Sequence, residues 1–203
     1  QTLESIISQA HSNIEIVIVD GASTDNTSEI VKSFQDKFPN LIYHRADKNM
    51  GVDRDMAKSV ELAHGEYCWL MSSDDILARG AIELILNKIT SRDEIYLCDI
   101  FHCDSDMIPW SRSHFIKKSH KTNKFNISKK KEFLDYMDLA TSNNALFCYM
   151  CSMIFLRKKW MNTEFNELMD NSGYAHVYSL FSFRKTGCTI NYISTPLVLN
   201  RTE

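Results

Sequence analysis

Apolar residues in the first hundred positions alternate between short continuous runs and stretches with helical spacing. The run over 14–19 is rich in β-branched residues and ends at Asp20 and Gly21, which is typical of a buried parallel strand. Two further apolar runs, at 41–43 and 67–71, predict strands of the same kind. Apolar positions three and four apart predict helices around these strands, over 1–11, 26–38, 49–64 and 78–89.

This alternation of strands and helices determines the expected fold class. Consecutive β–α–β units predict an α/β protein with a mostly parallel sheet flanked by helices. Because such crossovers are right-handed, we expect Asp20 and Asp74, which follow the first and third strands, to lie at the same edge of the sheet. Ligands of open α/β sheets bind at that edge, outside the carboxyl ends of the strands.

The second half of the chain has weaker periodicity and predicts a small antiparallel and helical part. After a strand at 94–101, the lysine-rich segment 103–128 shows no regular spacing. We interpret it as a solvated loop, with a basic flap over a phosphate-bearing ligand or an anionic membrane face as the alternative. We then expect helices at 132–140 and 173–185 and strands at 146–156, 189–193 and 197–200. Because the chain shows no repeats or linkers, we expect residues 1–203 to form a single domain.

Composition and charge narrow the classes of function. With 203 residues, of which 44% are hydrophobic and 24% charged, the chain has the composition of an ordinary globular domain. A net charge of −3 gives no electrostatic reason to expect nucleic-acid binding. No apolar run reaches the ~18–20 residues that a membrane-spanning helix needs. The six cysteines lack the spacing of a zinc site, so we expect reduced thiols in a cytoplasmic protein.

The end of the strand at 67–71 carries the strongest chemical signal. It is followed by Ser72 and Ser73 and then by the adjacent carboxylates Asp74 and Asp75. Neighbouring carboxylates repel each other unless a proton or cation lies between them, so the pair suggests a divalent metal. The alternative is a polar turn whose acids cap the helix expected next.

Two long motifs resemble those of family 2 glycosyltransferases with the GT-A fold. The string I-V-I-V-D-G-A-S-T-D-N-T at 16–27 is similar to the family's V-D-G-S-x-D-x-T segment. Residues 65–75, G-E-Y-C-W-L-M-S-S-D-D, resemble its acidic metal-binding segment, at the separation found in the family. Shorter strings at 51–55 and 173–177 are most similar to an abequosyltransferase-like subgroup, whose members take a CDP-sugar to build O-antigen repeats.

The resemblance implies an inverting, metal-dependent transferase that uses a UDP- or CDP-linked sugar. Asp20 would contact the pyrimidine base, because a carboxylate can accept the N3–H of uracil or the amino group of cytosine; a turn acid is the alternative. Arg54 would reach the nucleotide or else belong to a solvated charge cluster. The residues implied for the donor are Asp20, Gly21, Arg54, Ser73 and Asp74, and those for Mn²⁺ or Mg²⁺ are Asp74 and Asp75.

The resemblance places the acceptor chemistry in the second half of the chain. Residues 1–102 would bind the nucleotide, and residues 103–203 would bind a glycan or a lipid-linked saccharide, with peripheral contact at the inner membrane face. The candidate bases are His176, whose imidazole titrates near neutral pH, and Asp170. The alternative for His176 is a hydrogen-bonded core residue. The sequence predicts no oligomeric state.

Two features depart from the family pattern. The family begins with an apolar strand and a turn that contacts the nucleotide, and we expect this strand to be missing here because the chain starts within a helix. Ser72 stands where the acidic segment usually has its first aspartate, which puts the ribose contact in doubt. A nucleotidyltransferase on a similar fold and a non-catalytic nucleotide- or carbohydrate-binding relative are therefore the competing hypotheses.

Overall fold

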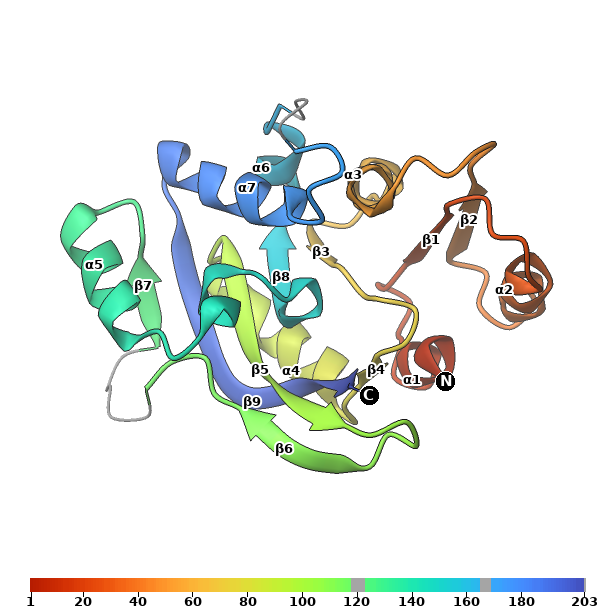
Figure 1. Cartoon of the computed structure of the whole chain (residues 1–203), viewed down its shortest axis with the longest axis horizontal. Coiled ribbons are helices and arrows are strands. Elements are labelled where there is room, and N and C mark those ends of the chain that lie inside the picture. The colour runs from red at the N-terminus through yellow and green to blue at the C-terminus, as the bar shows by residue number, and fades with distance from the viewer. Residues whose placement is uncertain (118–122, 165–168, 203) are drawn as a thin grey trace.

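The structure is a computed structural model that describes residues 1–117, 123–164 and 169–202. It contains a small parallel pair of strands, β1 (Ile16–Asp20) and β2 (Leu41–Arg45), beside a larger sheet of seven strands (Figure 1). The larger sheet has the order β3-β8-β5-β9-β4, with β6 paired to β5 and β7 paired to β9. Its strands are β3 (Tyr67–Trp69), β4 (Ile76–Leu77), β5 (Ile95–Cys103), β6 (Pro109–Ser113), β7 (Lys124–Asn126), β8 (Met153–Leu156) and β9 (Thr189–Arg201).

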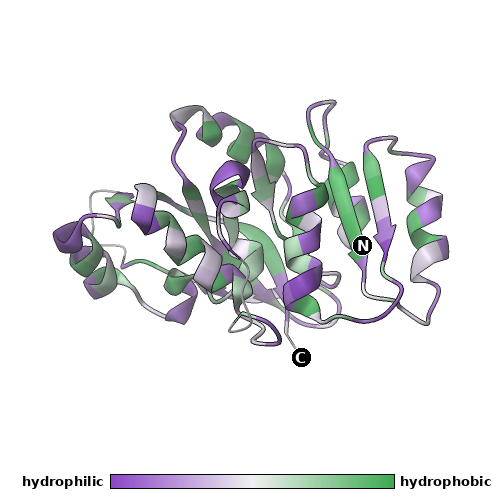
Figure 2. Ribbon diagram, turned by 90° about the horizontal axis from the view of Figure 1, so that it is seen from above, coloured by the Kyte–Doolittle hydropathy of each residue, from purple (hydrophilic) through white to green (hydrophobic). Residues whose placement is uncertain are grey.

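Helices cover these sheets, and most begin and end close to the predicted positions. The α-helices of the described residues are α1 (Thr2–Ile7), α2 (Thr27–Gln35), α3 (Val52–Leu62), α4 (Ala81–Lys88), α5 (Lys130–Leu139), α6 (Arg157–Met161) and α7 (Ala175–Ser182). Hydrophobic and hydrophilic residues are interspersed along these helices (Figure 2), and the buried ones include Val31 in α2, Val60 in α3 and Ile85 in α4. Helix α3 packs against β1, α6 and α7, and therefore connects the small sheet to the second half of the chain.

The α/β fold class is confirmed, but the sheet is mixed rather than mostly parallel. Among the described strands, β1–β2 and β5–β9 pair in parallel, and the remaining pairs are antiparallel. The cause is β8, which enters the sheet between β3 and β5 and pairs antiparallel with both. A strand from late in the chain thus separates two strands that a simple β–α–β pattern would make neighbours.

The small sheet also changes the expected position of the acids. Within the described residues, β1 pairs with β2 and not with β3, so Asp20 and Asp74 follow strands of different sheets. The prediction that Asp20 and Asp74 lie at the same edge of one sheet is therefore wrong, because their strands belong to two separate sheets. The two segments are instead linked through α1, where the Thr2 hydroxyl donates to the Ser73 carbonyl at 2.8 Å and the Ser5 hydroxyl accepts from the Leu77 amide at 3.1 Å.

The segment expected as an irregular loop contains two strands. β6 and β7 both lie within 103–128, and residues 118–122 of the same segment lie outside the described part. The sequence pattern missed them because β6 is largely exposed and lacks an apolar face, and β7 has only three residues, too few to establish a period. The two short strands expected at the C-terminus form one long strand, β9, which continues through Pro196 with register shifts opposite Asp99.

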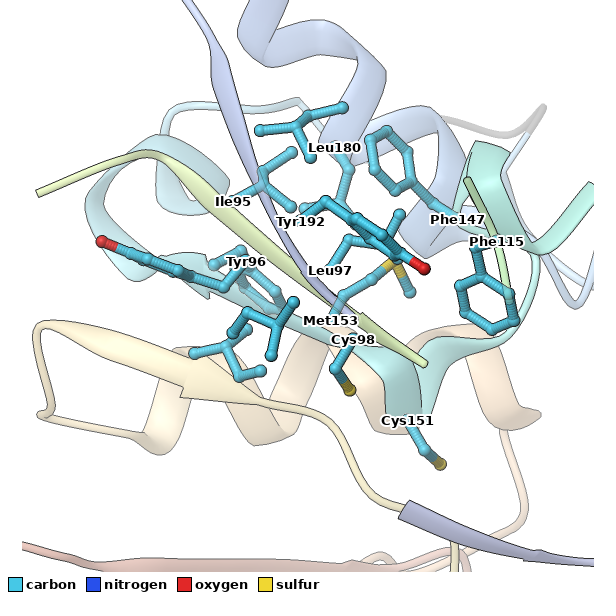
Figure 3. Packing of buried hydrophobic residues seen from close by; sticks show 14 of the residues in the cluster. Ile95, Tyr96, Leu97, Cys98, Phe115, Phe147, Cys151, Met153, Leu180 and Tyr192 are labelled. Carbon is cyan, nitrogen blue, oxygen red and sulfur yellow. The ribbon is translucent and has the colours of Figure 1, made fainter. Parts of the chain in front are cut away.

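Strand β5 is the centre of the main core. Its residues Ile95, Leu97 and Cys98 are fully buried, and successive side chains point to opposite faces (Figure 3). Phe147 and Tyr192 pack on the face that holds Leu97 (Figure 3). A separate, smaller cluster of Ile16, Val31 and Leu41 joins β1 and β2 to α2. All six cysteines are free thiols, as expected for reduced cysteines.

No helix within the described residues is long and apolar enough to cross a membrane.

Candidate functional site

Asp20 ends β1 and is buried, with both carboxylate oxygens already engaged. Oδ1 accepts from the Ser23 amide at 2.7 Å, and Oδ2 accepts from the Tyr43 hydroxyl at 2.6 Å, with Arg45 Nε at 3.5 Å. Burial raises the pKa of Asp20, but these hydrogen bonds and Arg45 outweigh it and hold the pKa below its usual value. Asp20 therefore fixes the turn that follows β1, and a nucleobase would have to share its oxygens with these donors.

The acidic segment after β3 runs into a strand rather than a helix. β4 follows Asp75 directly, and the residue before α4 is Gly80, so the acids do not cap that helix. Ser72 organises the turn, since its hydroxyl lies 2.5 Å from Asp74 Oδ1 and 2.7 Å from Asp75 Oδ2. The serine that replaces the family's first aspartate thus spaces the two remaining carboxylates.

Asp75 is buried and saturated with hydrogen-bond donors. Oδ2 accepts from the Tyr149 hydroxyl at 2.5 Å and from Ser72, while Oδ1 accepts from the Asn200 amide at 3.1 Å and the Arg201 backbone amide at 3.0 Å. Burial raises the pKa of Asp75, but the four hydrogen bonds lower it by more, so the pKa lies below its usual value and the carboxylate stays ionised. Asp75 therefore anchors the end of β9 to the acidic turn and offers no free oxygen.

Asp74 is the exposed acid of the pair. Its carboxylate contacts Ser72, and its carbonyl accepts from Arg201 Nε at 3.2 Å. No group of three or more His, Cys, Asp or Glu side chains able to hold a metal occurs among the described residues. Mg²⁺ and similar cations bind nucleotide substrates through one or two carboxylates, with phosphate oxygens and water as the other ligands. The single open carboxylate of Asp74 fits that arrangement, and the buried Asp75 supports it through Ser72.

Helix α3 holds the segment that precedes α7 with two adjacent residues. Arg54 donates to both oxygens of Asp170, at 2.9 Å from Nε and 2.6 Å from Nη2. Asp53, which is 1% exposed, accepts from the Gly173 amide at 2.7 Å and the Ala175 amide at 3.0 Å. The Asp53 carboxylate thereby caps the N-terminus of α7 from another helix. The Arg54–Asp170 pair lowers the pKa of Asp170 and raises that of Arg54.

His176 lies in the first turn of α7 and is 3% exposed. Among the described residues, neither ring nitrogen has a hydrogen-bond partner of normal geometry. Burial lowers the pKa of this imidazole, and the nearby backbone of Cys148 and Phe147 offsets the effect only in part. The ring is therefore neutral at pH 7 and able to accept a proton, beneath the exposed Tyr174, whose ring centroid is 6.2 Å away.

The structure arranges the predicted residues in three groups. Asp20 and Gly21 lie at the end of β1, Ser73 to Asp75 lie between β3 and β4, and Arg54, Asp170 and His176 lie where α3 meets α7. Sequence analysis did not find the supporting contacts. Tyr149 and Asn200 are far from Asp75 along the chain, and no sequence pattern indicates that they contact it. Asp53 could have been found, because a charged residue on the apolar face of a predicted helix indicates a buried polar contact.

A model described as glycosyl transferase family 2 matches residues 1–185. The abequosyltransferase RfbV of Salmonella typhimurium is 34% identical over 208 residues, which cover 99% of this chain and 62% of that protein. The minor teichoic acid biosynthesis protein GgaB of Bacillus subtilis is 23% identical over 172 residues, which cover 82% of this chain and 17% of that protein. The chain thus spans about three fifths of the length of the first relative and a smaller share of the second.

The crystal structure of S. aureus TarS 1-349 in complex with UDP has the same fold. It superimposes with a TM-score of 0.74 at 16% identity, over 100% of this chain and 56% of that one. The likeness confirms the GT-A architecture expected from the sequence motifs.

Proposed function

Because this chain belongs to glycosyltransferase family 2, we propose that it moves a sugar from a UDP- or CDP-linked donor to a hydroxyl of a glycan or lipid-linked saccharide. The observation that carries the proposal is the acidic turn after β3, where Asp74 is open to solvent and Asp75 holds the turn in place. The names of the relatives support a role in surface polysaccharide synthesis, since one is an abequosyltransferase and another a teichoic acid biosynthesis protein.

The transfer exchanges one bond at the anomeric carbon of the donor sugar. The acceptor oxygen forms a bond to that carbon on the face opposite the leaving group, the bond to the diphosphate oxygen breaks, and the configuration inverts. A divalent cation, Mn²⁺ or Mg²⁺, would supply Lewis-acid neutralisation of the leaving diphosphate if it were bound at this turn. We assign its protein ligand to Asp74, with Ser73 beside the donor and Asp75 as the positioning residue that orients the turn.

At the other end of the donor, Asp20 and Gly21 lie beside the base. The lowered pKa of Asp20 keeps its carboxylate ionised, and its hydrogen bonds to Ser23 and Tyr43 hold the turn that borders the base. Arg54 acts through Asp170: its bidentate contact holds the segment before α7 in place, and that segment belongs to the proposed acceptor half at 103–203.

For the proton of the acceptor hydroxyl, we assign His176 in preference to Asp170. Asp170 is ionised in a bidentate pair with Arg54, which makes it a weaker base, whereas His176 is neutral and has no partner for either ring nitrogen among the described residues. Because His176 is buried, this role requires the side chains around it to move when the acceptor binds. The acceptor would be presented at the inner membrane face, with this chain in the cytoplasm and in peripheral contact.

Titration calorimetry with UDP and CDP, in Mn²⁺ and then in EDTA, tests the donor site. We expect metal-dependent binding of at least one nucleotide, with binding lost in Asp74→Ala because the exposed carboxylate is removed. Asp36→Ala is the matched control, since Asp36 is an exposed acid at the end of α2. Binding that survives both EDTA and Asp74→Ala would refute the metal assignment. Absence of binding in a folded protein would favour a non-catalytic relative.

A further inference from the structure

The carboxylate of Asp55 lies in the first turn of α3, directly against the end of β1. A Cβ placed on Gly21 would lie 2.6 Å from Asp55 Oδ2 and 3.6 Å from its Cγ, so only glycine leaves room for this contact. Gly21 follows Asp20 in the chain, and the Asp55 carboxylate therefore borders the turn that the donor base is proposed to occupy.

Asp55 differs from its neighbours because its carboxylate has no hydrogen-bond donor among the described residues, whereas the Asp53 carboxylate and the Arg54 guanidinium both have partners. Asp53 accepts two amides before α7, and Arg54 is paired with Asp170. Both Asp20 oxygens are also occupied, by the Ser23 amide and the Tyr43 hydroxyl. Of the acids around the end of β1, Asp55 has the oxygens that a ligand can reach without displacing a protein group.

An unpartnered, half-buried carboxylate is costly for the fold. Removing it from water without a replacement hydrogen bond destabilises its charged form. Burial, followed by the repulsion from Asp20, raises the pKa of Asp55, and His44 on β2 opposes the shift. A carboxylate kept half-buried without a donor is typical of a side chain whose partner is a ligand.

We infer that Asp55 accepts a hydrogen bond from the nucleobase of the donor, and that Gly21 is a glycine because this carboxylate must lie against it. This inference rests on the proposed function. Uracil presents its N3–H and cytosine its amino group, and a carboxylate accepts from either. Asp20 then acts as a positioning residue for the turn, and Asp55 makes the contact to the base.

Nucleotide titration of Asp55→Ala and Asp55→Asn tests the assignment, with Mn²⁺ present throughout. We expect Asp55→Ala to bind UDP and CDP roughly tenfold or more weakly, the loss of one hydrogen bond to a charged group. Asp55→Asn presents a donor where the carboxylate only accepts, so the ratio of UDP to CDP affinity should change. Binding of Mn²⁺–pyrophosphate, which has no base, should stay unchanged. Asp47→Asn, at a nearby exposed acid, is the matched control.

Gly21→Ala provides a second, independent variant. The added methyl group must displace the Asp55 carboxylate, so nucleotide affinity should fall as in Asp55→Ala, and the double variant should lose no more than either single one. If the wild type binds nucleotide and both Asp55 variants bind it with a Kd within twofold of the wild-type value, this inference alone is overturned. A wild-type protein that binds neither nucleotide would overturn the proposed function and this inference with it. Melting temperatures of all variants verify that they are folded.

Discussion

Replacing Asp53 by alanine removes the cap that one helix provides for another. The carboxylate is 1% exposed and accepts from the backbone amides of Gly173 and Ala175, with the Ser172 hydroxyl at 3.3 Å. In the variant, both amides lose their acceptor at the point where α7 begins. The consequence reaches the candidate site, because His176 is the second residue of that helix.

The magnitude follows from these contacts. Hydrogen bonds to a charged group contribute about 1.5–3 kcal/mol each. Alanine avoids the desolvation of the carboxylate and gains about 0.5 kcal/mol of helix propensity in α3, which offsets part of the loss. We therefore expect the free energy of unfolding to fall by about 3 kcal/mol for Asp53→Ala. For a chain of this size that corresponds to a melting temperature lower by about 6–12 °C.

Urea unfolding at pH 7, followed by circular dichroism, measures the change. Asp53→Asn keeps one neutral acceptor oxygen and should lose less than Asp53→Ala. Asp135→Ala on the exposed face of α5 removes a carboxylate without such contacts and should unfold like the wild type. A loss below about 1 kcal/mol in Asp53→Ala, with an unchanged denaturant slope, would refute the capping argument.

Two further predictions concern buried groups of the site. The pKa of His176 is lowered in the folded state, so its contribution to stability is complete above the unfolded pKa of about 6.5 and is lost as the pH falls below that value. The free energy of unfolding should therefore decline between pH 7 and pH 5 more steeply in the wild type than in His176→Met. Equal slopes would contradict the lowered pKa of the buried imidazole. Tyr149→Phe removes a donor to the buried Asp75 and should lower the free energy of unfolding by about 1–3 kcal/mol at pH 7. Because the pKa of Asp75 is lowered in the folded state, the stability that its carboxylate contributes is lost as the pH falls through the folded pKa. The difference in free energy between the variant and the wild type should therefore shrink in acid, which urea unfolding from pH 7 to pH 3 would show.

The sequence by itself determined the fold class, the elements of the first half and the family. Alternating apolar runs and helical spacing were sufficient for β1, β2, β3 and the helices between them, because these elements are set by local patterns of burial. The motifs at 16–27 and 65–75 marked the acidic turn that holds Asp74 and Asp75, without distinguishing the two carboxylates. The approximate positions of Asp20 and Gly21 followed from the same strings.

Only the tertiary structure decided how the strands pair and which acids remain open. β8 separates β3 from β5, and no local pattern specifies which distant strand a given strand will pair with. Three carboxylates that look alike in the sequence have different roles because of contacts made far along the chain. Asp75 is engaged by Tyr149 and by the end of β9, and Asp53 by the start of α7, whereas the Asp55 carboxylate lies against Gly21 without a hydrogen-bond donor in the described part of the chain. Hydrogen-bond satisfaction depends on the whole fold, and it alone separates the acids that hold the structure from those that can bind a ligand.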